Sequence, residues 1–443
     1  MSEAMSLPKT GQRREAVLEK MRALRSDDAR WKEGKTFSLV YHASDEVSRL
    51  LADAYTMFMA ENALSPMAFP SLRRFEAETV AMAADLFHGG AEAAGTLTSG
   101  GSESILLAVK TARDRLRVEK GITAPEMVLP RSVHPAFQKA AHYFGVKAVH
   151  APLGPDFRAD VGAMRGLVTA NTVLVVGSAP AYPHGVVDPI EEIAALAQER
   201  GLSCHVDSCL GGFLLPFAKK LGHPVPPFDF SVPGVTSLSA DLHKYGFAAK
   251  GASVLLHRTR DLRRHQFFTY AEWPGGLYFS PSMTGTRPGG AIAAAWAVLH
   301  FLGEEGYLAL ARGILDTTRK LREGVAATPG LNVLGKPVMS VFAFASDTLD
   351  VYALGDAMEA RGWKLDRQQK PPALHLMVTP AHAPVADLFL SDLRDCAARL
   401  ARGEPAPEGS AAMYGMLGAV PDRSTLDGFI LDFMEGLYEL PAS

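Results

Sequence analysis

The stretch that best indicates the fold of this chain is Gly95-Thr-Leu-Thr-Ser-Gly-Gly-Ser-Glu-Ser-Ile-Leu-Leu-Ala108. It begins as a short apolar strand over Gly95–Thr98, turns at two glycines and continues as an expected helix over Ser102–Val118. Small residues let backbone N–H groups approach an anion, and the N-terminus of a helix favours negative charge. The stretch therefore predicts a strand–turn–helix unit that binds a phosphate, with a serine-capped glycine turn as the plain structural alternative.

The same alternation of apolar runs and helical patterns continues to about residue 300. Further helices are expected at Pro135–Tyr143 and Pro189–Arg200. This order favours an α/β fold with a mainly parallel sheet that is covered on both faces, in which ligands bind beyond the C-terminal ends of the strands. The seven strands that we expect are Gly95–Thr98, Met127–Leu129, Ala148–His150, Thr172–Val176, Ser203–Val206, Ser237–Ser239 and Ser253–Leu256.

Two segments with a different order of expected helices and strands flank this region. Residues 1–60 form an N-terminal helical segment, with helices at Gln12–Leu24 and Asp45–Met59 and Ser44 as an N-cap. Residues 61–300 form the large domain, and residues 301–443 form a smaller α+β domain. The elements expected in the small domain are a long helix at Leu302–Ala326, strands at Leu331–Val333 and Val338–Phe344, helices at Val351–Arg361 and Ala386–Arg402, and a loop at Arg402–Gly409.

Composition excludes several classes of protein. The chain has 443 residues, 47% of them hydrophobic, with 45 basic and 48 acidic residues, so nothing favours nucleic-acid binding or general adsorption to membranes. The three cysteines form no C-x-x-C pair and are expected to be reduced thiols of a cytoplasmic protein. The histidines lack metal-ligand spacing, so no metal site is expected. The apolar run Ala291–Leu302 is too short to span a bilayer and is expected to be a buried helix.

Three polar residues, taken together with the predicted phosphate site, predict a binding site for a complete cofactor. Asp207 ends an expected strand, where it would pair with a protonated ring nitrogen or cap the following turn. Lys244, in Ser239-Ala-Asp-Leu-His-Lys-Tyr-Gly246, would be a desolvated nucleophilic amine or an ordinary surface lysine. His134 opens a helix, where its ring would stack on a flat cofactor or cap that helix. A phosphate loop, a strand-end carboxylate and a lysine, in that order, are the parts that pyridoxal phosphate (PLP) requires.

At these residues the chain resembles the sphingosine-1-phosphate lyase branch of the group II PLP-dependent decarboxylases. The similarity covers about residues 35–300 and continues more weakly to Met413–Met416. It implies PLP fold type I, the architecture of aspartate aminotransferase, and an obligate homodimer whose active sites are shared between the subunits. The segments that carry it are Phe69–Leu72, Thr98–Ala108, Pro183–Pro189, His205–Phe213, Gly234–Gly251 and Gly285–Gly290.

The resemblance also implies roles for individual residues. Lys244 would hold PLP as a Schiff base, Asp207 would pair with the pyridine nitrogen, and His134 would stack on the ring. Gly101, Ser102 and His243 would bind the cofactor phosphate, joined by Thr286 from the partner subunit. On the substrate side the matching residues are Tyr41, Asn62, Ser65, Tyr182 and Lys250, of which Lys250 would bind a substrate phosphate and Tyr182 would help to move protons.

The chain departs from the lyase pattern at a few positions. Asn62-Ala-Leu-Ser65 stands where the lyases have Asn-Pro-Leu-His, and a serine cannot carry the positive charge of a histidine. Ser102 replaces a threonine and keeps the hydroxyl group. The membrane-spanning N-terminus of the eukaryotic lyases is not present in this sequence, so we expect a cytoplasmic protein without stable membrane insertion.

The resemblance predicts a carbon–carbon lyase that acts on a small phosphorylated amine. In that reaction a sphingoid base phosphate undergoes retro-aldol cleavage to a fatty aldehyde and phosphoethanolamine. The alternative is a PLP-dependent amino-acid decarboxylase, which would use the same cofactor residues on an amino acid. A third hypothesis is an inactive PLP-fold protein that serves as a binding module, but the presence of Lys244, Asp207 and His134 argues against it.

Overall fold

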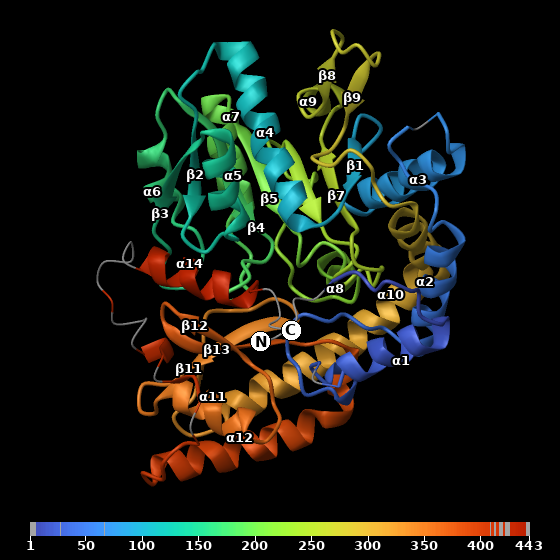
Figure 1. The fold of residues 1–443 in the computed structure, drawn as a ribbon. Helices are drawn as coiled ribbons and strands as arrows, with labels where there is room; N and C mark the ends of the chain where they lie inside the picture. Colours follow the sequence, from blue (N-terminus) through green and yellow to red (C-terminus); the bar gives the residue numbers. More distant parts are fainter. Residues whose placement is uncertain are drawn as a thin grey trace.

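Two sheets, each with its own hydrophobic core, organise the chain. The structure is a computed structural model that describes residues 6–26, 28–65, 67–407, 409–411, 413–415, 420 and 426–439. The larger core surrounds a seven-stranded sheet and the smaller one a four-stranded sheet. Figure 1 shows the large sheet with its helices above the small domain, and a two-stranded hairpin that projects at the top.

The large sheet confirms the prediction of a mainly parallel sheet. Its order is β1-β7-β6-β5-β4-β2-β3. The strands β6, β5, β4, β2 and β3 run parallel, whereas β7 is antiparallel to both β1 and β6. All seven predicted strands are present, as β1 (Ala94–Thr98), β2 (Glu126–Pro130), β3 (Lys147–Ala151), β4 (Thr172–Ser178), β5 (Ser203–Asp207), β6 (Ser237–Ala240) and β7 (Ser253–His257).

Helices cover this sheet as the alternating pattern requires. The strand β4, with the sequence TVLVVGS, is buried along its whole length, as expected for a parallel strand between helical layers. The helices that pack on the sheet are α4 (Gly101–Lys120) across β4 to β7, α7 (Ile190–Arg200) on β4 and β5, α6 (Val161–Leu167) on β2 and β3, and α3 (Pro70–Leu86) on β1 and β7. The helix α5 (Ala136–Phe144) packs against α4. The predicted α4, α5 and α7 are confirmed, whereas the sequence analysis did not identify α3.

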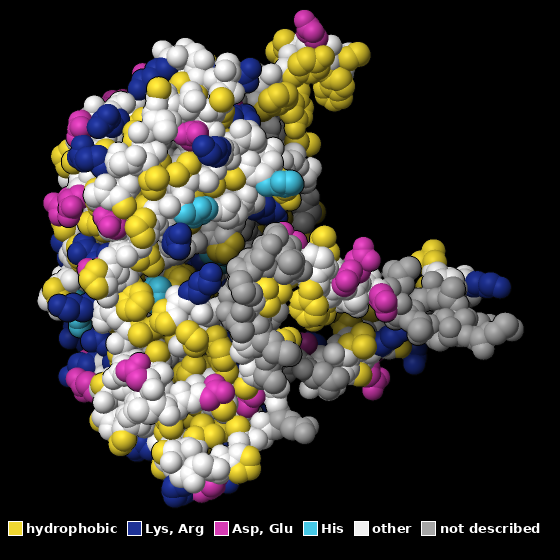
Figure 2. Space-filling model, turned by 90° about the vertical axis from the view of Figure 1, so that its left-hand side faces the viewer, with side chains coloured by type: hydrophobic (Ala, Val, Ile, Leu, Met, Phe, Trp, Pro, Cys, Tyr) yellow, Lys and Arg dark blue, Asp and Glu magenta, His cyan; other side chains and the backbone are white. Residues whose placement is uncertain are grey.

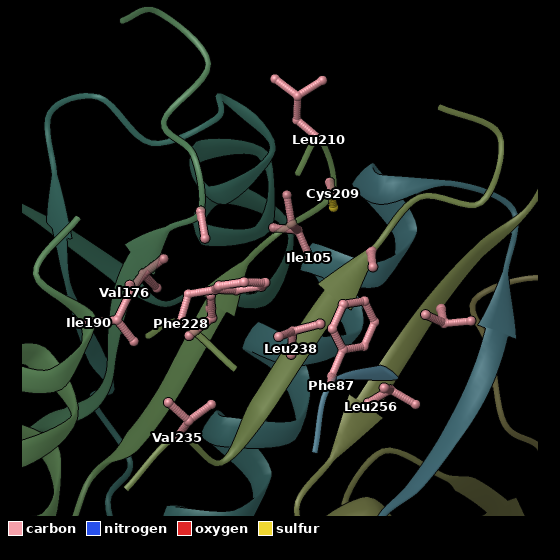
Figure 3. Packing of buried hydrophobic residues seen from close by; sticks show 14 of the residues in the cluster. Phe87, Ile105, Val176, Ile190, Cys209, Leu210, Phe228, Val235, Leu238 and Leu256 are labelled. Atoms are coloured by element: carbon pink, nitrogen blue, oxygen red, sulfur yellow. The ribbon is translucent and has the colours of Figure 1, made fainter. Parts of the chain in front are cut away.

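Side chains from adjacent strands pack together in the larger core. Leu238 in β6 and Leu256 in β7 are paired in register and fully buried. Figure 3 shows both near Phe87, whose ring makes an edge contact with Phe228 at a centroid distance of 6.5 Å. Burying each such side chain stabilises the fold by about 1.5–3 kcal/mol. This packing therefore holds the neighbouring strands in place relative to each other.

The N-terminal segment and the small domain follow the predicted order. Ser44 caps α2, since its Oγ accepts a hydrogen bond from the Val47 N–H at 3.1 Å. The long helix α10 is broken at Gly303, which has φ of 54°. The small sheet is antiparallel, in the order β10-β11-β13-β12. The elements are α1 (Arg14–Leu24), α2 (Asp45–Met57), α10 (Gly289–Ala326), β10 (Asn332–Val333), β11 (Val341–Ala345), α11 (Val351–Glu359), β12 (Asp366–Gln369), β13 (Pro372–Met377), α12 (Ala386–Ala401) and α14 (Leu426–Leu437).

A hairpin with exposed aromatic side chains stands apart from both cores. It consists of β8 (Phe268–Tyr270) and β9 (Tyr278–Ser280), and Phe268, Trp273 and Phe279 are exposed. Figure 2 shows it as a hydrophobic projection at the top of the molecule. Its base is held by Lys110, whose Nζ donates to the carbonyl oxygens of His265 and Gln266 at 2.8 and 3.0 Å. Short elements complete the fold at η1 (Trp31–Glu33), α8 (Leu215–Lys220), α9 (Arg260–Arg264) and η2 (Pro380–Val385).

Some predictions stay open. The predicted domain boundary after residue 300 falls inside α10, just before the break at Gly303, and the boundaries remain predictions. Glu408 in the predicted loop and Met416 in the weakly similar segment lie outside the described residues. Among the described helices, none has the length and apolar character needed to cross a membrane.

Gly185 tests the packing between the two cores. It has φ of +67°, and a Cβ at this position would collide with the carbonyl oxygen of Val341 in β11. We expect Gly185→Ala to lower the free energy of unfolding by about 1–3 kcal/mol, because backbone strain and overpacking add. Urea unfolding of the purified protein measures this change.

Gly166 is the matched control. It lies in α6 with open space around it. Alanine there should leave the free energy of unfolding unchanged or raise it by up to about 1 kcal/mol through helix propensity. Equal unfolding midpoints for the two variants would contradict the proposed collision at Gly185.

Candidate functional site

The C-terminal ends of five strands meet along one edge of the large sheet. The strands β2, β4, β5 and β6 are parallel, and β1 runs in the same direction because both β1 and β6 are antiparallel to β7. The segments that leave these ends therefore gather at one place, which is where α/β sheets bind ligands. They carry the glycine turn, His134, Tyr182, Asp207 and Lys244.

Two adjoining cavities lie at this edge. The glycine-loop cavity has a volume of about 340 Å³ and is lined by Ser99, Gly100, Gly101, Ser102, Glu103, Ile105 and Asp241 besides the shared residues. The tyrosine cavity has a volume of about 300 Å³ and is lined by Ser38, Leu39, Tyr41, Ser178, Pro180, Tyr182, Asp207, Leu210, Lys250, Asp366 and Met377. The shared residues are His134, Cys209, His243 and Lys244, so Lys244 reaches both cavities. Two larger cavities, of about 650 and 640 Å³, lie elsewhere and contain none of the predicted site residues.

The glycine turn packs closely against the segment that carries Lys244. A Cβ on Gly101 would lie 2.8 Å from both the Asp241 Oδ2 and the Cys209 Sγ. A Cβ on Gly100 would lie 3.2 Å from the His243 Cε1. Only a residue without a side chain allows this approach, which places the N-terminus of α4 at the wall of the glycine-loop cavity.

The other donors at this wall suit an anion. Ser102 opens α4, and it is exposed and lines the cavity. The Nδ1 of His243 accepts a hydrogen bond from the Ala252 N–H at 3.2 Å, so a neutral ring carries its proton on Nε2. Burial lowers the pKa of His243, which keeps the ring neutral at pH 7. A helix N-terminus, a hydroxyl and an imidazole N–H together match a phosphate group.

A charge pair anchors Lys244 in the turn between β6 and β7. Its Nζ lies 2.8 Å from the Oδ2 of Asp241, and its side chain is only 25% exposed. Burial by itself lowers the pKa of Lys244, but the charges of Asp241 and its neighbours outweigh burial, so the pKa is raised above its ordinary range. Lys244 is therefore an ammonium ion in the protein alone, and not the surface lysine of the alternative interpretation.

Asp207 caps the turn that follows it, as one of its two interpretations from the sequence predicts, and pairing with a ring nitrogen stays a prediction. It is 7% exposed at the end of β5, and its Oδ1 accepts a hydrogen bond from the Cys209 N–H at 3.0 Å. The carboxylate therefore caps the following turn, yet it also lines the tyrosine cavity. Behind it, His205 is hydrogen-bonded to Ser237 and Ser239 of β6, which holds the two strand ends together.

His134 bonds to the start of its helix, as one of its two predicted roles requires, and the stacking role stays a prediction. Its Nδ1 accepts a hydrogen bond from the Ala136 N–H at 3.1 Å at the start of α5. Its exposed ring lines both cavities, where a flat cofactor would meet it. Capping the helix fixes the ring plane, which favours the stacking role over free rotation.

Both domains contribute to the tyrosine cavity. The Tyr182 hydroxyl donates to the Oδ2 of Asp366 in β12 at 2.7 Å. Burial, and after it the charge of Asp366, raises the pKa of Tyr182, so the phenol keeps its proton at neutral pH. The Tyr41 hydroxyl lies 2.7 Å from the Sδ of Met377 in β13.

Lys250 adds a second positive charge to this cavity. Its Nζ lies 5.0 Å from the centroid of the Tyr41 ring and contacts the Leu39 carbonyl oxygen at 3.2 Å. Burial, and after it the charge of Lys244, lowers the pKa of Lys250. Within the described part of the chain Lys250 forms no ion pair, so its charge is available to a ligand.

Three predicted residues lie outside both cavities. Thr286 lines a small cavity of about 90 Å³ beside Ser99 and Gly251 of the same chain. Asn62 forms a β-bridge with Pro288, so the Asn62–Ser65 segment lies beside the segment that carries Thr286. Glu103 connects this unit to the glycine turn, because its carboxylate accepts N–H groups from Ser99 at 2.6 Å and Met283 at 2.8 Å.

Several residues of the site are not among those predicted from the sequence. Asp241 and Cys209 stand inside segments that carry predicted site residues, and the i, i+3 spacing of Asp241 and Lys244 was a usable signal. Asp366 and Met377 follow Lys244 by more than 120 residues. No local pattern connects either residue with the large sheet, so only the tertiary structure reveals them.

These residues fit PLP. The glycine cradle, the hydroxyl of Ser102 and the His243 N–H match its phosphate, and Asp207 provides a buried carboxylate for a cationic ring nitrogen. Lys244 is the amine that reaches both cavities, as a covalent attachment point must.

Comparison with known proteins agrees with this fit. The model of the pyridoxal-dependent decarboxylase conserved domain matches residues 3–346. The chain belongs to the pyridoxal-dependent decarboxylase family. It is 47% identical over 432 residues to the sphingosine-1-phosphate lyase of Arabidopsis thaliana, an alignment that covers 95% of this chain and 79% of that protein.

Solved structures place it in the same branch. The sphingosine-1-phosphate lyase Bpss2021 of Burkholderia pseudomallei is 41% identical, with a TM-score of 0.90, and the match covers 99% of this chain and 98% of that one. Glutamate decarboxylase of Lactobacillus brevis, at 20% identity and a TM-score of 0.78 over 90% of this chain and 95% of that one, shares the fold. The predictions of a sphingosine-1-phosphate lyase-like family member, a PLP-type fold, a PLP cofactor and a lyase are thereby confirmed. The roles of the individual residues stay predictions.

The attachment of the cofactor to Lys244 is testable by spectroscopy. We expect Lys244→Ala to lose the visible absorption band of lysine-bound PLP, because Lys244 is the lysine of the predicted set that lines both cavities. Absorption spectra of the purified, PLP-saturated protein measure this loss.

Lys250→Ala is the control, since Lys250 is the other lysine lining the tyrosine cavity. This variant should keep the band. An unchanged spectrum in Lys244→Ala, or loss of the band in Lys250→Ala alone, would refute the assignment.

Proposed function

We propose that this enzyme cleaves the C2–C3 bond of a phosphorylated sphingoid base by a retro-aldol reaction. The products are a fatty aldehyde and phosphoethanolamine. The observation that carries the proposal is the ammonium of Lys250 in the tyrosine cavity beside Lys244, which forms no ion pair with any residue that the structure describes. The similarity to the lyases of Arabidopsis thaliana and Burkholderia pseudomallei supports the same substrate class.

The cofactor-binding residues have distinct roles in the proposal. Gly101, Ser102 and His243 hold the PLP phosphate, and His134 stacks on the ring. Asp207 pairs with the ring nitrogen, and Lys244 is the point of attachment. When bound there, PLP supplies an electron sink for the bond that breaks.

Lys250 recognises the substrate phosphate. Its present partners at Nζ are the carbonyl oxygens of Leu39 and His243, at 3.2 and 3.4 Å, which are weak partners for an ammonium ion. A phosphate would replace them by charge-assisted hydrogen bonds, which are roughly twice as strong as neutral ones. An amino acid whose side chain has no anionic group gives this lysine no comparable partner, so Lys250 favours the lyase over a decarboxylase of such an amino acid.

Tyr182 and Lys244 move the protons that the reaction needs. The C3 hydroxyl of the substrate must lose a proton and C2 must gain one. With its raised pKa, Tyr182 acts as a proton donor and not as a base at neutral pH. Asp366 orients the hydroxyl of Tyr182, since it accepts its hydrogen bond at 2.7 Å. Lys244, once released from the cofactor as an ammonium ion, supplies the proton that C2 gains.

The active enzyme is a homodimer in this proposal. Thr286, Asn62 and Ser65 lie outside the two cavities at Lys244 in their own chain and in one connected unit, which supports a role for them at the site of the partner subunit. The exposed aromatic hairpin precedes Thr286 and gives the second subunit an apolar surface to cover.

The three buried free cysteines support the cytoplasmic location that we propose.

The reaction is tested by product analysis. We expect the PLP-saturated enzyme to release a long-chain aldehyde and phosphoethanolamine from dihydrosphingosine phosphate, without CO2. A panel of amino acids provides the comparison. Release of CO2 from an amino acid, with no aldehyde from the phosphorylated base, would favour the decarboxylase alternative and overturn the proposal.

The role of Lys250 is tested by removing its charge. We expect Lys250→Met to lower kcat/KM for dihydrosphingosine phosphate by about 10- to 100-fold, mainly through KM, since it removes one charge-assisted hydrogen bond. Steady-state kinetics measure the change.

Lys139→Met is the control, because the Lys139 Nζ also lies over a tyrosine ring, 5.5 Å from that of Tyr143, but outside the cavities. The control should retain the kinetics of the unmodified enzyme. A KM unchanged by Lys250→Met would refute phosphate recognition by Lys250.

A further inference from the structure

The carboxylate of Asp241 is buried at the site, and none of the roles above uses it. It directly follows β6 and is 2% exposed. The Lys244 N–H donates to the Asp241 carbonyl oxygen at 3.3 Å, which closes a turn between the two residues. The backbone therefore sets the Asp241 carboxylate within reach of the Lys244 ammonium, at 2.8 Å.

The two oxygens of this carboxylate differ in their partners. Oδ2 pairs with Lys244, whereas Oδ1 is buried and accepts no hydrogen bond within the described structure. A buried carboxylate that lacks hydrogen bonds is costly unless a cation stands beside it. The ammonium of Lys244 is that cation, so each group depends on the other when the lysine is free.

The other groups around Lys244 do not replace Asp241. Burial, and after it the charges of Asp207 and Asp241, keeps the pKa of the Cys209 thiol high, so it carries no charge. The pKa values of the nearby phenols, Tyr41, Tyr182 and Tyr245, are raised mainly by burial, so they stay neutral. Asp207 faces the tyrosine cavity, and its Oδ1 accepts a hydrogen bond from the backbone. His243 is a neutral ring, and Lys250 is itself a cation, so neither can balance the charge of Lys244.

We propose that Asp241 is a positioning residue that holds the ammonium of Lys244 whenever this lysine is not attached to the cofactor. The inference rests on the proposed role of Lys244. Lys244 is freed each time a substrate amine takes its place, and the three hydrogens of the incoming ammonium group end on the Lys244 Nζ. Asp241 receives this new charge inside the cavity, which keeps the lysine near its point of reattachment and spares it from exposure to water.

The proposal is tested on the cofactor-free protein, so the readout does not depend on activity. Formaldehyde with cyanoborohydride methylates only unprotonated amines, and peptide mass spectrometry follows Lys244 as the pH is raised. We expect Asp241→Asn to lower the pH of half-maximal methylation of Lys244 by at least about one unit, because the charge that raises the pKa of the lysine is gone. Below that pH, Lys244 should then be methylated about tenfold faster than in the unmodified protein.

Asp229→Asn is the matched control. Asp229 is also a buried aspartate, and its Oδ2 lies 2.8 Å from the Nδ1 of His88, away from both cavities. Its variant should reproduce the pH profile of the unmodified protein for Lys244. A profile of Asp241→Asn that coincides with that of the unmodified protein would overturn the inference.

A second measurement keeps the test valid even if Asp241→Asn does not fold. In the unmodified, cofactor-free protein, Lys244 should reach half-maximal methylation at a higher pH than Lys250, because the pKa of Lys244 is raised and that of Lys250 is lowered. The opposite order would also overturn the inference. Covalent PLP at a lysine other than Lys244 would instead contradict the proposed role of Lys244. That result is distinguishable from a failure of the inference about Asp241.

Discussion

An ammonium ion that is three-quarters buried has to be balanced, and the contact between Lys244 and Asp241 meets this requirement at 2.8 Å. The strength of such a pair depends on its geometry, since the loss of hydration has to be offset by close contact. The short turn after β6 supplies that geometry, and β6 in turn is held between β5 and β7. The neighbouring cavities, the glycine turn and the second lysine are all arranged around this pair.

The glycine turn shows how far this arrangement reaches. Gly101 lies against both Asp241 and Cys209, so the N-terminus of α4 comes as near to the lysine segment as backbone atoms permit. A helix N-terminus and an ammonium ion thus flank one small volume from different elements. Figure 3 shows Cys209 beside Ile105, and both residues line this cavity. The hydrogen-bond donors that face the glycine-loop cavity therefore come from backbone packing as much as from charged side chains.

The parts of the fold that could be predicted from sequence are those with a local physical signal. The strand at Thr172–Val176 is a run of β-branched residues interrupted only by Leu174, and the turn at Gly100 and Gly101 carries its own conformational requirement. By contrast, β12 reads Asp-Arg-Gln-Gln and has no apolar alternation, so its strand depends on pairing with β13. The contact of Asp366 with Tyr182 follows from that pairing and from the position of the small domain, which no short pattern encodes. Asp241 lies between these cases, because its spacing to Lys244 was visible but its burial was not.

The hydrogen bond between Tyr182 and Asp366 also has a consequence for selectivity. Tyr182 is carried by the large sheet, whereas Asp366 and Met377 are carried by the small one, so the width of the tyrosine cavity depends on how the two cores rest on each other. A substitution at their interface, far from any atom that a ligand touches, changes the shape of the cavity without changing its lining. The length and bulk of the molecules that such an enzyme accepts can therefore diverge between relatives whose lining residues are identical.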